Sequence, residues 1–374
     1  MNSKKRILFL ISNLGYGGAE KVLVNLVNNM DKGTFDVTVQ TLFDTGVNRK
    51  YIKSDVHYIP GLKHEFLGNS HLIRCLPAKW LYKFYIKDGY DIVVAFLEGN
   101  ATKVLSGCSN PNTKKVAWVH IEMSSIRTEF KSKEEAVKEY DKFDKIVYVA
   151  QTVKEAFEKA SKPFTQGCVL YNVNETDKII KKSQEPFDDV IFNKNEINVI
   201  SVAKIMQTKG FDRLAKVHKR LLDEGLKHHI YILGVGEEQK KIEQYLKENG
   251  LQDTFTFLGY RDNPYKYVKA ADLYVCSSRR EGFSTAVTEA LIVGTPVVST
   301  CCSGAYELLG ENNEYGIVMD NSEEGIYEGM KKMLSDEKLR KYYSKMAELR
   351  GKEFSTEKTV AAVEEMFVGL FDGE

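Results

Sequence analysis

Three kinds of signal are missing from this sequence of 374 residues, and each absence narrows the class of protein. No apolar run reaches the roughly 18 residues that a membrane-spanning helix needs, so the sequence predicts none. The basic start at residues 4–6 and the apolar run behind it are too short for a signal peptide, and this run predicts a first β-strand instead. The six cysteines include no C-x-x-C pair, which argues against a zinc ribbon and indicates reduced thiols in a cytoplasmic protein.

An overall excess of one charge is also missing, because 53 basic residues face 52 acidic ones. The distribution is uneven: residues 1–172 contain 25 Lys and Arg against 18 Asp and Glu, a net charge of +7, and the remainder contains 28 against 34, a net charge of −6. This asymmetry either arises by chance or indicates that the first half faces an anionic partner, such as a lipid phosphate or a membrane surface.

The sequence does contain a repeated alternation of short apolar strands and amphipathic helices, which is typical of doubly wound α/β sheets. The predicted strands lie at 6–11, 35–43, 91–97, 115–119 and 145–150, and then, after a break, at 197–203, 229–234, 254–258, 272–276 and 296–299. The break at 173–196 is polar, and we interpret it as a linker. Because single cores stop growing near roughly 250–300 residues, we expect two Rossmann-like domains, at 1–172 and 197–354.

The strongest candidate site follows a predicted buried strand that ends at Ser277. A helix is expected to begin near Ser284 or Thr285, which can cap it, and its free N–H groups would attract a phosphate. Glu281 precedes this helix and Glu289 lies about one turn inside it. Carboxylates repel phosphate but accept hydrogen bonds from hydroxyl groups, so we interpret the pair as contacts to a nucleotide sugar. The alternative is an ordinary capped helix with carboxylates near its dipole.

Two further loops follow predicted strands at positions that suit a phosphate. Lys204 and Lys209 flank a loop at the carboxyl end of the strand at 197–203, where they could neutralise a diphosphate leaving group; the alternative is a loop that meets only solvent. The loop at Gly15–Gly18 offers backbone N–H groups at another helix N-terminus. It lacks the third glycine of a dinucleotide fingerprint, because Glu20 stands there.

Two polar residues end strands of the first half. His120 ends the strand KKVAWVH, and Glu98 ends the strand DIVVAFLE. The carboxyl ends of parallel strands are where such sheets place their sites, so both residues are candidates. The alternative for His120 is a histidine that is hydrogen-bonded within its loop.

These motifs together resemble glycosyltransferase family 4, a large group of retaining enzymes with the GT-B fold, over nearly the whole chain. The most specific is Glu281 separated by seven residues from Glu289, which ALIVGTPVVST follows. The other matching stretches are GGAE at 17–20, KGFDRL at 209–214, GYRDNPY at 259–265, WVH at 118–120 and FLEG at 96–99. The last three are similar to bacterial polysaccharide members.

The resemblance implies a role for each matching residue. Glu281 would bind the donor hexose and Glu289 the ribose, whereas His120 would lie beside the transferred sugar, Arg261 near the base and Glu98 on the acceptor side. Residues of the two glycine-containing loops would hold the diphosphate: Gly17, Gly18, Gly282, Phe283, Ser284 and Thr285. The chain departs from the family at Ala203-Lys204, where Gly-Arg is usual, and lysine lacks the forked geometry of arginine.

The resemblance also implies two facing Rossmann-like domains with the active site in the cleft between them. The first would bind the acceptor and the second the nucleotide sugar, and an amphipathic helix at about 355–374 would pack back on the first. Its expected buried stripe is Val360, Val363, Met366, Phe367 and Leu370. The nucleoside diphosphate would leave from an anomeric carbon with oxocarbenium character. No D-x-D motif follows a strand, so we expect no essential metal and no cofactor besides the co-substrate, a UDP-sugar.

The acceptor is less constrained. Residues 71–87 mix four basic residues with four aromatic ones. Such a stretch either lies on an anionic membrane interface or forms an ordinary helix that covers the sheet, with the aliphatic parts of its long basic side chains packed along apolar surface. The family resemblance favours transfer of a hexose or N-acetylhexosamine to a lipid-linked saccharide, at the inner face of the membrane, in polysaccharide or capsule assembly. No nucleic acid partner is expected.

Three other functions remain open from the sequence. A nicotinamide oxidoreductase would need its acidic residue about 20 positions after the glycines, whereas Asp44 lies 27 positions past Gly17. A sugar-nucleotide epimerase would use the same fold. A non-catalytic GT-B partner subunit is the third, and the intact Glu281 and Glu289 argue against it.

Overall fold

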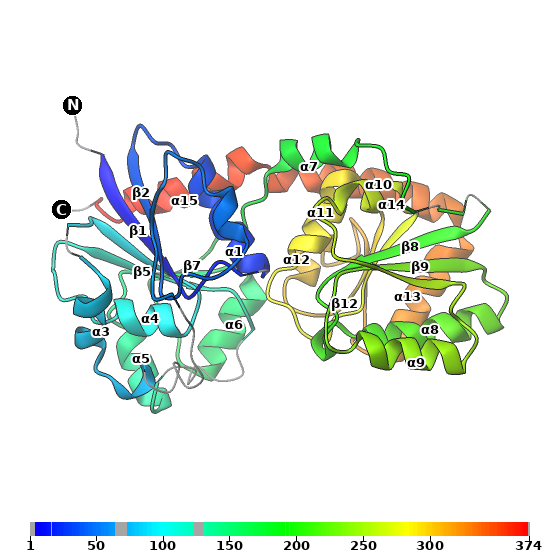
Figure 1. Ribbon diagram of the computed structural model, residues 1–374, viewed down its shortest axis with the longest axis horizontal. Coiled ribbons are helices and arrows are strands. Elements are labelled where there is room, and N and C mark those ends of the chain that lie inside the picture. The colour runs from blue at the N-terminus through cyan, green and yellow to red at the C-terminus, as the bar shows by residue number, and fades with distance from the viewer. Residues whose placement is uncertain are drawn as a thin grey trace. The chain divides into compact units, whose positions relative to one another are not determined.

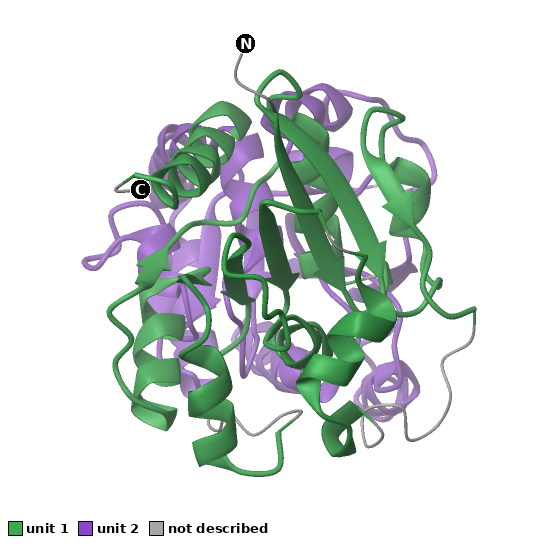
Figure 2. Cartoon of the chain, turned by 90° about the vertical axis from the view of Figure 1, so that its left-hand side faces the viewer, with its two compact units in different colours: residues 1–174, 356–374 green, residues 175–355 purple. Residues whose placement is uncertain are grey.

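A computed structural model of the chain describes residues 4–15, 17–63, 73–87, 89–122, 130–190, 192–193 and 195–372. The chain divides into two compact units (Figure 2): unit 1 comprises residues 1–174 and 356–374, and unit 2 comprises residues 175–355. Each unit is built around one parallel β-sheet, so the predicted fold class, two Rossmann-like α/β domains, is confirmed.

The sheet of unit 1 has seven strands in the order β3-β2-β1-β4-β5-β6-β7. They are β1 (Lys5–Ile11), β2 (Phe35–Thr41), β3 (His57–Ile59), β4 (Ile92–Phe96), β5 (Lys114–Val119), β6 (Lys145–Tyr148) and β7 (Gly167–Val169). The central strand β4 is buried along its whole length. Such an unbroken apolar run is expected where helices cover both faces of a parallel sheet.

Helices cover both faces of this sheet (Figure 1). On one face lie α1 (Gly18–Asn29) and α15 (Thr356–Gly369), and on the other lie α3 (Ala78–Tyr85), α4 (Asn100–Leu105), α5 (Lys133–Tyr140) and α6 (Gln151–Ala160). The end of the chain packs on this unit, because the ring of Phe367 in α15 lies 5.9 Å from that of Phe9 in β1. Of the predicted stripe, Val360, Val363 and Phe367 are buried, and Met366 and Leu370 are half-buried.

The sheet of unit 2 has six strands in the order β10-β9-β8-β11-β12-β13. They are β8 (Ile197–Val202), β9 (His228–Leu233), β10 (Phe255–Gly259), β11 (Leu273–Cys276), β12 (Val297–Thr300) and β13 (Ile317–Met319). On one face lie α8 (Phe211–Asp223), α9 (Gln239–Glu248) and α13 (Glu323–Ser335) (Figure 1). On the other lie α7 (Thr176–Ser183), α10 (Tyr265–Ala270), α11 (Thr285–Val293) and α14 (Glu337–Gly351), and α12 (Ala305–Leu309) follows β12.

The stretch 173–196 is more ordered than the linker that its polar composition suggests. It contains helix α7, which packs against α10 and α11 within unit 2. Only Thr176, Ile179 and Ser183 of this helix are buried, so its apolar face is too narrow to stand out among the charged residues of TDKIIKKS.

Candidate active site

In each unit, some of the candidate residues follow the two strands at which the strand order reverses. In unit 2, β8 lies between β9 and β11, and in unit 1, β1 lies between β2 and β4. The loops that leave the carboxyl ends of two such strands run to opposite faces of the sheet and leave a crevice, which is where doubly wound sheets bind ligands. Lys209 follows β8 and Glu281 follows β11; in unit 1, the Gly15–Gly18 loop follows β1 and Glu98 follows β4.

Helix α11 begins as the sequence predicts. Ser284 is its N-cap, and its side-chain oxygen accepts a hydrogen bond from the backbone N–H of Val287 at 3.4 Å. The N–H groups of Thr285 and Ala286, which precede the capped N–H of Val287, lie too early in the helix for an acceptor within it and suit an anion. Phe283 contributes only its backbone to such a site, because its buried side chain packs on Phe354 with ring centroids 5.9 Å apart.

Glu281 and Lys209 meet in the structure. The Nζ atom of Lys209 lies 2.6 Å from Oε1 of Glu281, and the same oxygen accepts a hydrogen bond of 2.6 Å from the hydroxyl group of Ser278. Burial opposes the charge of Lys209, but the Glu281 carboxylate raises the pKa of this lysine above its usual value. Lys209 is therefore a held cation whose charge Glu281 balances, rather than a free lysine on a loop.

The loops that carry these two residues are joined by further contacts. The hydroxyl group of Ser277 donates to the carbonyl oxygen of Lys209 at 2.9 Å. The backbone N–H of Arg279 donates to the backbone carbonyl oxygen of Thr208 at 2.7 Å. The backbones approach so closely that a Cβ atom on Gly210 would lie 2.1 Å from the carbonyl oxygen of Ser277. Gly210 also has a φ of +68°, so both its space and its conformation require glycine.

Charged residues that the sequence analysis did not single out support these loops. The guanidinium of Arg279 makes two hydrogen bonds of 2.7 Å to Asp212, and Arg213 donates to the carbonyl oxygen of Ser277 at 2.8 Å. Asp212 and Arg213 stand inside the matching stretch KGFDRL, and Arg279 stands two residues before Glu281, so their position in or beside the motifs was the available signal. A bidentate pair such as Arg279–Asp212, with two parallel hydrogen bonds between guanidinium and carboxylate, holds a loop more rigidly than a single contact does.

Glu289 lies apart from that ion pair, on the second turn of α11. It is buried, and the phenolic hydroxyl group of Tyr265 in α10 lies 3.5 Å from its Oε1 atom. Tyr265 belongs to the stretch GYRDNPY, but its contact with Glu289 was not foreseen. The two carboxylates therefore have different surroundings: one is paired with a lysine and the other is near a tyrosine.

The remaining donor candidates of unit 2 are on its surface. Lys204 is exposed. Arg261 is half-buried, with its Nε atom 3.2 Å from Oδ2 of Asp189, so a ligand that approaches Arg261 would share it with a carboxylate.

The glycine loop of unit 1 has an acidic neighbour. Gly17 is the N-cap of α1, which begins at Gly18, and no side chain caps this end. A Cβ atom on Gly17 would lie 2.0 Å from the carboxylate of Glu20, so this carboxylate lies over the loop. A phosphate bound here would meet that negative charge unless Glu20 turned aside.

His120 and Glu98 are adjacent at the ends of β5 and β4. The backbone N–H of His120 donates to Oε2 of Glu98 at 2.8 Å. The backbone around Glu98 has unusual angles, with φ of +147° at Leu97 and +102° at Gly99. A non-glycine residue at such an angle is strained, and strain of this kind clusters at functional sites.

Burial makes both side chains unusual acids. It raises the pKa of Glu98 to about 7 and lowers that of His120 to about 3, so the imidazole is neutral at pH 7. The ring of His120 lies 4.7 Å from that of Phe96, and its buried Nε2 atom has no hydrogen-bond partner among the residues that the structure describes. A neutral imidazole with an unused ring nitrogen suits a hydroxyl group of a sugar.

The described part of the chain contains neither a cluster of metal-ligating side chains nor a membrane-spanning helix. Across the residues that the structure describes, no group of three or more His, Cys, Asp or Glu side chains is arranged to hold a metal ion. Of the helices in the described ranges, none has the length and the apolar character required to cross a membrane.

Comparison with known proteins identifies the second unit. Residues 182–350 match the family model described as "Glycosyl transferases group 1". This segment, which is less than half of the chain, is similar to the glycosyl transferases group 1. The matched range contains the donor candidates Lys209, Glu281 and Glu289, and it supports glycosyl transfer over the oxidoreductase alternative.

Relatives of this transferase extend over both units. The chain is 28% identical to the N-acetylgalactosamine-N,N'-diacetylbacillosaminyl-diphospho-undecaprenol 4-alpha-N-acetylgalactosaminyltransferase of Campylobacter jejuni, over 94% of this chain and 96% of that one. It is 30% identical to the lipopolysaccharide core biosynthesis glycosyltransferase LpsE of Rhizobium meliloti, over 38% of this chain and 41% of that one.

Solved structures of similar fold cover nearly the whole transferase. Anabaena Alr3699/HepE in complex with UDP and glucose superposes with a TM-score of 0.77 and 19% identity, over 97% of this chain and 99% of that one. Sucrose-phosphate synthase from Thermosynechococcus elongatus gives a TM-score of 0.78 and 16% identity, over 99% and 100%. At these identities the likeness establishes the fold, and it confirms the GT-B assignment.

Proposed function

We propose that this glycosyltransferase is a retaining member of family 4 that transfers a hexose or N-acetylhexosamine from a UDP-sugar to a lipid-linked saccharide. The observation that supports this most strongly is the cluster at the ends of β8 and β11. There the Lys209–Glu281 pair, with 2.6 Å between Nζ and Oε1, lies next to the N-terminus of α11. A cation and free helix N–H groups suit a diphosphate, and the two carboxylates suit the hydroxyl groups on either side of it.

The geometry supports a division of labour in the transfer step. When the bond between the anomeric carbon and the diphosphate breaks, negative charge grows on the phosphate and positive charge on the sugar ring. Lys209 and the N–H groups at Thr285 stabilise the former, and Glu281 is the carboxylate available to the latter. His120, neutral and with an unused ring nitrogen, would orient the transferred sugar. We assign no protein nucleophile and no essential metal.

Relatives support the substrate classes. The similar transferase of Campylobacter jejuni is named for a diphospho-undecaprenol-linked acceptor, and the protein of Rhizobium meliloti is named for lipopolysaccharide core biosynthesis. The similar Anabaena protein has a structure with UDP and glucose. By this analogy we propose a UDP-sugar donor and a role in cell-surface polysaccharide assembly, at the inner face of the membrane.

Helix α3 offers a surface for that membrane. Trp80 and Phe84, four residues apart and so on one face of the helix, are 74% and 71% exposed, and the exposed lysines Lys79, Lys83 and Lys87 lie beside them. Leu81 and Tyr82 face inward, so the helix covers unit 1 and still presents aromatic rings outward. Exposed aromatic rings with neighbouring lysines are typical of peripheral contacts with anionic membranes.

The test is transfer itself. The chain would be incubated with a panel of nucleotide sugars and polyprenyl-linked saccharides, with and without EDTA, and the products identified by mass spectrometry and by NMR of the anomeric linkage. We expect one UDP-sugar to give an α-linked product from an α-linked donor, and turnover to persist in EDTA. Inversion at the anomeric carbon, a metal requirement, or conversion of the donor without any acceptor would each contradict the proposal, the last by indicating an epimerase.

A further inference from the structure

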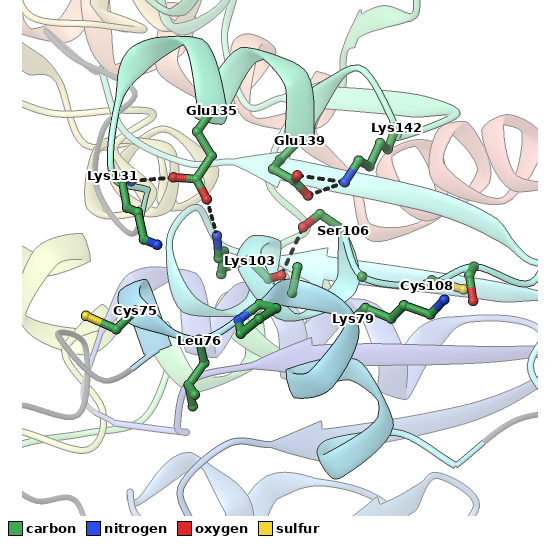
Figure 3. A pocket seen from close by; sticks show the side chains of 14 residues that line it. Cys75, Leu76, Lys79, Lys103, Ser106, Cys108, Lys131, Glu135, Glu139 and Lys142 are labelled. Atoms are coloured by element: carbon green, nitrogen blue, oxygen red, sulfur yellow. Dashed lines mark hydrogen bonds and ion pairs between the residues drawn. The ribbon is translucent and has the colours of Figure 1, made fainter.

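A groove separate from the candidate active site lies on unit 1. It has a volume of about 560 Å³ and is formed by the residues before and at the start of α3, by the end of α4 and by α5 (Figure 3). None of the residues predicted for the active site lines it. Its lining includes four lysines, Lys79, Lys103, Lys131 and Lys142, and two carboxylates, Glu135 and Glu139, which leaves a net charge of +2.

Both carboxylates are already neutralised. The side chain of Lys103 is only 3% exposed, its Nζ atom lies 2.6 Å from Oε1 of Glu135, and it lies 5.0 Å from the ring centroid of Phe130. The other oxygen of Glu135 accepts the backbone N–H of Lys131 at 2.7 Å. Lys142 contacts both oxygens of Glu139 at 2.6 Å. Figure 3 shows these contacts on the wall that α5 contributes.

The positive charge that remains belongs to Lys79 and Lys131. Within the described part of the chain, neither ammonium group forms an ion pair, and both side chains are exposed. A groove with two unpaired ammonium groups and no unpaired carboxylate selects an anion with more than one negative charge, and lysine binds phosphate as a compact point charge.

We infer that this groove binds the phosphate or diphosphate group of the acceptor lipid. This inference rests on the proposed function, which supplies a lipid-linked acceptor. It rests also on continuity along α3: Lys79 lines the groove, and the next residue, Trp80, is exposed with Phe84 on the surface proposed for the membrane. A phosphate group that emerges from the lipid layer would therefore find the groove beside the aromatic contact.

The first test measures phosphate binding. Inorganic pyrophosphate would be titrated calorimetrically into the full chain with UDP at saturation, so that the donor site is occupied. We expect Lys79→Gln combined with Lys131→Gln to weaken pyrophosphate binding on the order of tenfold or more. The control is Lys133→Gln combined with Lys138→Gln, which removes the same charge from exposed positions of α5 that do not line the groove.

Equal pyrophosphate affinity in the wild type and the groove variant would overturn the inference, and so would an equal loss in the control variant. Binding of UDP to the wild type is measured in a separate titration. If UDP does not bind, the proposed function is contradicted. The comparison of pyrophosphate affinity among the wild type, the groove variant and the control variant tests only the groove.

The second test distinguishes a lipid phosphate from a free one. Sedimentation would be compared for phosphatidylcholine vesicles with and without a polyprenyl phosphate. We expect the wild type and the control variant to prefer vesicles that contain the polyprenyl phosphate, and the groove variant to lose most of that preference. Pyrophosphate binding without any preference for the polyprenyl phosphate would overturn the assignment to the lipid.

Discussion

Lys209 and Glu281, 72 positions apart in the sequence, form an ion pair with 2.6 Å between Nζ and Oε1 at the carboxyl edge of the second sheet. The positive charge of Lys209 suits a departing diphosphate, and the negative charge of Glu281 suits a sugar ring that becomes positively charged. Their contact places both groups in one hydrogen-bonded unit, together with the hydroxyl group of Ser278 at 2.6 Å from the same oxygen.

The first prediction is that these two residues act as a unit in catalysis. Lys209→Met and Glu281→Gln each remove the same contact between the two side chains, so the double variant has no second contact of this kind to lose. The loss of kcat in the double variant should be smaller than the product of the two single losses, with a coupling energy of about 1–3 kcal/mol. A double-mutant cycle of kcat measures this, and strictly additive effects would show that the contact has no role in turnover.

The second prediction concerns stability and pH at Glu98. Burial raises the pKa of this carboxyl to about 7, above its value in the unfolded chain, so folded Glu98 holds its proton more tightly. The unfolded chain therefore binds fewer protons between about pH 4.5 and 7, and the contribution of Glu98 to stability falls as the pH rises through this window. Glu98→Gln has no carboxyl group to titrate and so avoids this loss of stability. The difference in melting temperature, variant minus wild type, should therefore increase as the pH is raised from 5 to 8.

The buried His120 does not confuse this comparison. Its pKa is lowered to about 3, so its effect on stability has the opposite sign, but the histidine is present in both proteins and cancels. A pH-independent difference in melting temperature between wild type and Glu98→Gln would mean that Glu98 is ionised in the folded chain.

Most of the fold could be predicted from the sequence, because its signals are local. Buried strands such as β4 are unbroken apolar runs, and the restart of the strand–helix alternation near residue 197 marks the second sheet. The cap at Ser284 follows from its position before an apolar helix. Helix α7 was missed because it buries only three residues and the rest of its sequence is charged or polar.

The geometry of the site could be predicted only in part. Strand order places Lys209 and Glu281 at one edge of the sheet, but nothing local says that their side chains meet rather than each facing a ligand. The carboxylate of Glu20 over Gly17, the pairing of Arg261 with Asp189 and the positive φ of Leu97 likewise depend on tertiary packing. Such contacts between distant residues leave no periodic signal in the sequence.

The third prediction concerns the aromatic surface of α3. Replacing Trp80 and Phe84 with serine should reduce sedimentation with anionic vesicles several-fold, because two exposed rings lose their place in the interface. Replacing Arg74, Lys79 and Lys83 with serine should also reduce sedimentation with anionic vesicles, and the contribution of these basic residues should become smaller as salt is added. Tyr342→Ser is a control, since this tyrosine is 51% exposed but lies on unit 2. Equal sedimentation with neutral and anionic vesicles would exclude a membrane role for this helix.

The fourth prediction separates the two carboxylates of the donor site. Glu289, buried on the second turn of α11, is proposed to bind the ribose, where contacts hold the ground state and the transition state alike. Glu289→Gln should therefore mainly raise the donor KM. Glu281 precedes the helix and is proposed to meet the sugar that gains positive charge, so Glu281→Gln should mainly lower kcat, on the order of 10²-fold.

The most direct test of the whole account is calorimetric titration of the wild type, Glu281→Gln and Glu289→Gln with UDP, which contains the ribose and the diphosphate but no hexose. We predict that UDP affinity falls for the Glu289 variant and hardly changes for the Glu281 variant. If the Glu281 variant loses UDP while the Glu289 variant keeps it, the two roles are reversed. If UDP binds none of the three proteins, or if neither variant differs from the wild type in UDP binding or rate, these carboxylates only flank a helix N-terminus and the assignment of the donor site is wrong.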